Sequence, residues 1–84
     1  MDDALQRIAA NSKSLQSRIE HLISQRNAIY RSLCAELSRI SPASISNASV
    51  SNTANVLTQI AEINAEIRAL DIQVDFNNSV VAGF

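Results

Sequence analysis

Aliphatic residues recur along the second half of the chain at steps of 4, 3, 4, 3 and 4 residues. This spacing brings them to one side of an α-helix and matches the heptad of a coiled coil, whereas a strand would need a period of two. It predicts a helix from about 52 to 80 with one apolar seam. The seam consists of Val56, Ile60, Ile63, Ile67, Leu70 and Val74.

The first half shows the same spacing, which predicts a helix from about 3 to 40. Ser12 and Arg26 take two of the apolar places, and the pattern slips near Glu36, where Leu37 follows one residue late. A charge such as that of Arg26 either meets an acidic group across the interface or extends its stem toward water, and both alternatives stay open. The predicted seam on this side is Leu15, Ile19, Leu22, Ile29 and Leu33.

A Ser/Asn-rich segment separates the two periodic regions and is predicted to be a loop over 41–51. Pro42 disfavours the α conformation at Ser41, so the first helix should end near Ile40. Ile45 and Val50 are expected to pack against the helix ends. The chain therefore predicts an all-α fold in one domain, 1–84. Two long antiparallel amphipathic helices form a helical hairpin, or coiled coil, followed by a tail at 81–84.

A second apolar stripe lies off the seam of the second helix: Ala65, Ala69, Ile72, Phe76 and Val80. One partner helix cannot cover two sides of a cylinder, so we expect this stripe to meet another chain or the folded-back tail. The uncharged end of the chain extends the same surface. Self-association and binding to another protein both remain open. The predicted partner interface comprises Arg26, Ile72, Phe76, Val80, Val81 and Phe84.

The chain offers few other sources of stability or chemistry. It has 84 residues, with Cys34 as the one cysteine and His21 as the one histidine, so neither an internal disulfide nor a zinc site can form from them. Domains this small usually gain stability by association when they lack such links. Two helices offer a seam and no pocket, so we predict no catalytic, cofactor or metal site and no enzyme. Cys34 is interpreted as a small buried apolar residue.

Charge divides unevenly between the two halves. Residues 1–40 carry six basic and four acidic side chains, whereas residues 41–84 carry one and four. Opposite signs would help the helices pair with each other, or the first helix pair with an acidic protein. The net charge of −1 and the scatter of the basic residues around the helix argue against nucleic-acid binding.

Membrane insertion and secretion are not indicated by the sequence. No run of about 18 apolar residues is present, so no membrane span is predicted. The acidic start, Met1 to Ala4, lacks the basic and apolar regions of a secretory signal. The cytoplasm is the default expectation, and export by a route without a cleaved signal stays open.

The outline of two helices, a loop with Pro42 and a terminal Phe84 resembles the needle subunits of type III secretion systems. That family carries two prolines close together in the loop, where Ser41 to Ile45 contains one. Small helical-hairpin chaperones of the same systems fit the outline equally, and short coiled-coil subunits of eukaryotic assemblies are a further alternative. The predicted function is a non-enzymatic assembly subunit. The alternative is a chaperone or filament-forming subunit of a bacterial secretion apparatus, and a nucleic-acid-binding or regulatory protein is less favoured.

Overall fold

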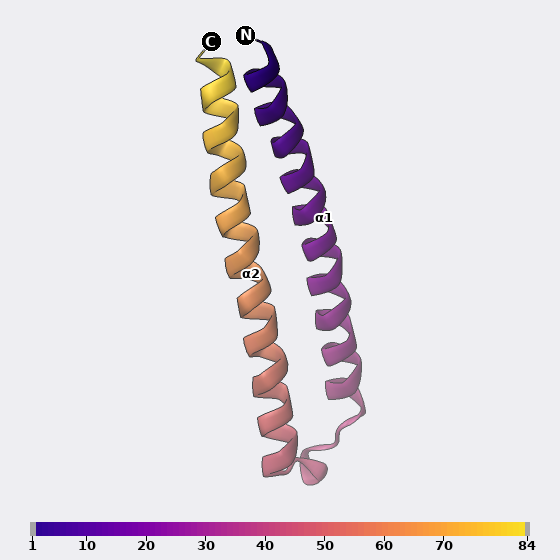
Figure 1. Ribbon diagram of the computed structural model, residues 1–84. Helices are drawn as coiled ribbons and strands as arrows, with labels where there is room; N and C mark the ends of the chain where they lie inside the picture. The colour runs from indigo at the N-terminus through magenta and orange to yellow at the C-terminus, as the bar shows by residue number, and fades with distance from the viewer. Residues whose placement is uncertain (1, 84) are drawn as a thin grey trace.

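The computed structural model describes residues 2–83, which form two long helices and one short turn. Helix α1 spans Asp2–Arg39, the 3₁₀ turn η1 spans Pro42–Ser44, and α2 spans Asn47–Ala82. No strand occurs between residues 2 and 83, and the predicted all-α class is confirmed. The helices lie side by side with both chain ends at the same end of the molecule, so they run in opposite directions (Figure 1). The result is a rod of 66 × 16 × 14 Å.

The contact between α1 and α2 is an aliphatic seam along the length of the rod. Leu22 is its most buried side chain, with 2% exposed. Burying an aliphatic side chain of this size contributes about 1.5–3 kcal/mol, so the seam is the main source of stability. All eleven residues that the spacing assigned to the seam are buried or half-buried. The central cluster comprises Ile19, Leu22, Ile63, Ile67 and Val74, with Leu15, Ile23, Ile29 and Leu70 packed against it.

The connection between the helices is shorter than the sequence predicted. Helix α2 begins at Asn47 rather than near 52, because the Ser46 hydroxyl accepts a hydrogen bond from the Ser49 backbone N–H at 3.2 Å and caps the helix there. Residues 47–51, expected in the loop, form the first turn of α2. Any Ser or Asn of this segment can cap a helix, so composition alone did not locate the start.

Helix α1 ends just before Pro42, and helix α2 ends just before Gly83. Ser41 is extended, with φ −80° and ψ 153°, as the residue before Pro42 prefers. Helix α2 continues to Ala82, two residues beyond the predicted end at 80, and the Gly83 N–H donates to the Ser79 carbonyl at 3.0 Å. Met1 and Phe84 lie outside the described residues.

The expectation that Ile45 and Val50 pack against the helix ends is wrong. Both are more than half exposed. Val50 lies within α2, where a single neighbouring helix covers the seam and leaves its flank open. Ile45 ends the 3₁₀ turn in an extended conformation beside the same flank.

Candidate protein-protein interface

The side of α2 that faces away from α1 carries an apolar strip, here called the outer stripe: Ala65, Ala69, Ile72 and Phe76. Steps of 4, 3 and 4 residues align these side chains about half a turn away from the seam. Ile72 is 64% exposed and Phe76 is 66% exposed, the largest values among the exposed large apolar residues between 2 and 83. The hairpin therefore leaves this apolar surface uncovered.

The ends of the predicted interface differ from its centre. Val80 is half-buried, so it does not continue the outer stripe as the spacing suggested, whereas Val81 is exposed. The predicted contact at Phe84 lies outside the described residues. The exposed surface is thus centred on Ile72 and Phe76, on a part of α2 that is regular helix throughout.

Charged side chains flank the outer stripe without interrupting it. Arg68 and Asp75 are seven residues apart and so lie on the same flank. Glu66 lies on the other flank, where its carboxylate accepts a hydrogen bond from Arg18 of α1 at 3.1 Å. An exposed apolar patch with a polar rim is typical of a protein interaction surface.

Arg26 is placed inside the hairpin rather than on the exposed surface. Its Nη1 donates to the Asn64 Oδ1 across the seam at 3.0 Å, and its Nε and Nη2 donate to the Asn27 Oδ1 at 3.2 and 3.1 Å. Arg26 forms no ion pair with any described residue. Within the hairpin, Arg26 therefore neither meets an acidic group nor extends into water. The half-buried guanidinium is held by two amides.

A second polar layer interrupts the seam nearer the chain ends. Ser12 and Asn77 are buried, and neither the Ser12 Oγ nor the Asn77 Nδ2 has a hydrogen-bond partner among the described residues. Counting from the Arg26–Asn64 contact, Ser12 lies 14 residues back and Asn77 lies 13 residues on. At 1.5 Å per residue both are about 20 Å away, at one level of the rod. The seam is therefore less favourable here than at its centre.

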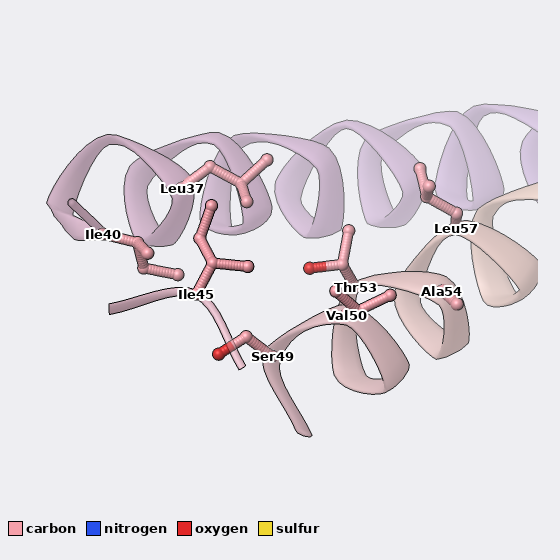
Figure 2. Close-up of a pocket in the computed structure, with 8 residues that line it drawn as sticks. All are labelled: Leu37, Ile40, Ile45, Ser49, Val50, Thr53, Ala54 and Leu57. Atoms are coloured by element: carbon pink, nitrogen blue, oxygen red, sulfur yellow. The ribbon is translucent and has the colours of Figure 1, made fainter. Parts of the chain in front are cut away.

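The loop end of the rod contains an apolar groove that the sequence analysis missed. Figure 2 shows its side chains coming from α1, from the connecting segment and from α2. The groove has a volume of about 380 Å³. Its apolar lining is Leu37, Ile40, Ile45, Val50, Ala54 and Leu57. The one available signal was the slip at Leu37, which moves an apolar side chain off the seam toward this flank.

Cys34 is exposed, so its interpretation as a buried residue is wrong. It lies one turn from Tyr30, and a hydrogen bond to the Cys34 side chain, together with its charge, raises the pKa of the Tyr30 hydroxyl. Between residues 2 and 83 no three His, Cys, Asp or Glu side chains cluster so that they could hold a metal ion.

Neither helix has, within the described residues, a stretch long and apolar enough to cross a membrane. Comparisons with family models, with curated proteins and with solved structures returned no match.

Proposed function

We propose that this chain is a non-enzymatic assembly subunit whose outer stripe is covered by another protein chain. The observation that carries the proposal is the exposure of Ile72 and Phe76, which are about two-thirds accessible on a regular helix. Large apolar side chains in a preformed position lose little conformational freedom when they bind. An aromatic anchor with an aliphatic neighbour is also the arrangement that usually supplies most of the binding energy at an interface.

The outward side of α1 supports this proposal by contrast. Its corresponding positions are exposed and mostly small or polar, as at Ser14, Ser17, Ser24 and Arg31. A hairpin built only to fold on itself would tolerate that pattern on both helices. Only α2 carries a row of uncharged residues with two large apolar members facing outward, so α2 is the proposed interaction helix.

A second candidate function is binding of a short apolar segment of another protein in the loop-end groove, as a chaperone subunit would do. The observation that favours it is the shape of the surface. The groove is concave and is lined on both sides by aliphatic residues such as Leu37 and Leu57. The outer stripe, in contrast, is a convex ridge that suits another helix.

The test is site-specific photo-crosslinking of the full chain in the cells that produce it. Benzoylphenylalanine would replace Phe76, Leu57 or, as a matched control, His21, which is exposed on α1. We expect a crosslinked product from position 76 and none from position 21. A crosslinked product from position 57 alone would mean that the loop-end groove, and not the outer stripe, binds the partner. Absence of any product at 76 and 57, with the helix content unchanged by circular dichroism, would overturn both candidate functions.

A further inference from the structure

We infer that the occupant of the outer stripe is a second copy of this chain, packed antiparallel across a two-fold axis, so that two hairpins form a flat layer of four helices with the two α2 helices at its centre. This inference rests on the proposed function and names the partner for the same surface. It is argued from the shape of the outer stripe and from the charges on its flank.

The outer stripe is complementary to itself when two copies of α2 run in opposite directions. In one register Ile72 faces Ala69 of the second copy, and Phe76 faces Ala65 of the second copy. A large side chain then meets a small one at each of the four levels, which allows the two helices to approach closely. The two-fold axis repeats every contact, so both outer stripes are covered at once.

The same register brings opposite charges together on one flank. Arg68 then lies within two residues, about 3 Å along the axis, of Asp75 of the second copy, and the symmetry creates the pair twice. The Arg18–Glu66 contact at 3.1 Å shows that such a flanking pair forms between antiparallel helices of this molecule. A parallel pair would instead bring opposite flanks of the two helices together, so Arg68 and Asp75 would not meet. It would also place Ile72 beside Ile72 and Phe76 beside Phe76, so large side chains would meet large ones.

Packing of α2 on α1 of a second copy is the competing arrangement. It would leave one outer stripe of each pair uncovered, so association would continue beyond two copies. Arg68 and Asp75 would then have no reciprocal partners. The size of the assembly and its response to a charge exchange therefore separate the two arrangements.

The experiment is sedimentation equilibrium of the purified full chain and four variants. We expect the wild-type chain to sediment at twice 9.1 kDa. Arg68→Glu or Asp75→Lys alone places like charges opposite each other at two symmetric sites and should raise the dimer Kd about tenfold or more. The double variant restores both pairs with exchanged signs and should return the Kd to within about threefold of wild type. Arg31→Glu, an equal charge reversal on the outward side of α1, should leave the Kd unchanged.

Disulfide trapping provides an independent measurement if a charge variant loses helix content. In a Cys34→Ser background, Ala69→Cys and Ile72→Cys chains are mixed and oxidised. The inferred register predicts a mixed disulfide in preference to either symmetric one.

The second-copy inference would be overturned if the wild-type chain were monomeric. It would also be overturned if the assembly contained more than two chains and its Kd did not change in the charge variants. A crosslinked product at position 76 with a mass other than twice that of the chain would overturn it too, while leaving the proposed function in place. Absence of every crosslinked product would remove the proposed function as well.

Discussion

The two faces of α2 both carry large apolar side chains and lie in opposite environments. Ile63 and Ile67 face α1 and are buried, whereas Ile72 and Phe76 face away and are about two-thirds exposed. The difference does not come from the side chains, because both pairs are large and apolar. It comes from the single neighbouring helix, which can cover one side of a cylinder. The comparison shows that the fold of one chain covers only one of the two apolar faces of α2.

The same contrast occurs between two adjacent residues near the end of α2. Phe76 is 66% exposed, whereas Asn77 is 8% exposed and has an unpartnered amide nitrogen. A polar side chain thus lies in the seam while its apolar neighbour lies outside it. This inversion is opposite to what hairpin stability alone would favour.

Truncating an isoleucine on either face should give the largest difference. Ile67→Ala removes buried methyl groups from the seam and should lower the free energy of unfolding by about 2–4 kcal/mol at any protein concentration. Ile72→Ala, the matched change on the outer stripe, should leave the concentration-independent part of the stability within about 0.5 kcal/mol of wild type. Denaturant unfolding followed by circular dichroism at several protein concentrations measures both values. Equal losses would mean that the two faces are equally buried in the isolated chain.

Replacing the buried amide should have a smaller effect in the opposite direction. Asn77→Leu, combined with Ser12→Ala, removes two unpartnered polar groups from the seam. We expect the free energy of unfolding to rise by about 1–2 kcal/mol, because a buried polar group without a partner costs about that much. The single variant Ser12→Ala serves as the control for the hydroxyl. A fall in the thermal midpoint of the double variant would show that these groups are hydrated or bonded in solution.

The ion pair on the flank should contribute least. Arg18 and Glu66 are about half exposed, so water and salt screen their attraction. Glu66→Gln keeps the shape of the side chain and should change the free energy of unfolding by at most about 0.5 kcal/mol. The difference should vanish in 1 M salt. A loss above about 1 kcal/mol that persists at high salt would mean that this flank is buried by another chain.

Most of the fold was predictable, because long aliphatic periodicity is a local signal repeated many times. The seam positions on α1 and α2 followed from the steps between apolar residues. The start of α2 was not predictable from composition, since Ser46, Ser49, Ser51 and Asn52 can each cap a helix. Which of them does so depends on how far the chain must travel after Pro42 to bring α2 against α1.

The exposed surfaces were predictable only in part. The outer stripe around Ile72 and Phe76 was visible as a second periodic row, since it lies on a single helix. The loop-end groove combines Leu37 of α1, Ile45 of the connection and Leu57 of α2. Residues this far apart in sequence share one flank only after the register between the helices is set. The exposure of Cys34 likewise depends on which side of α1 faces α2, and this is set only when the two helices pack together.

The adjacency of the chain ends at one end of a 66 Å rod also determines how the molecule would bear load. A force that pulls Asp2 and Gly83 apart would act on the seam one layer at a time from the chain ends, and it would soon reach the level of Ser12 and Asn77, where buried groups lack partners. The two helices would separate progressively along the seam, at low force. A force applied between the loop and the chain ends would instead slide all layers past one another together, and the rod would resist it far more strongly.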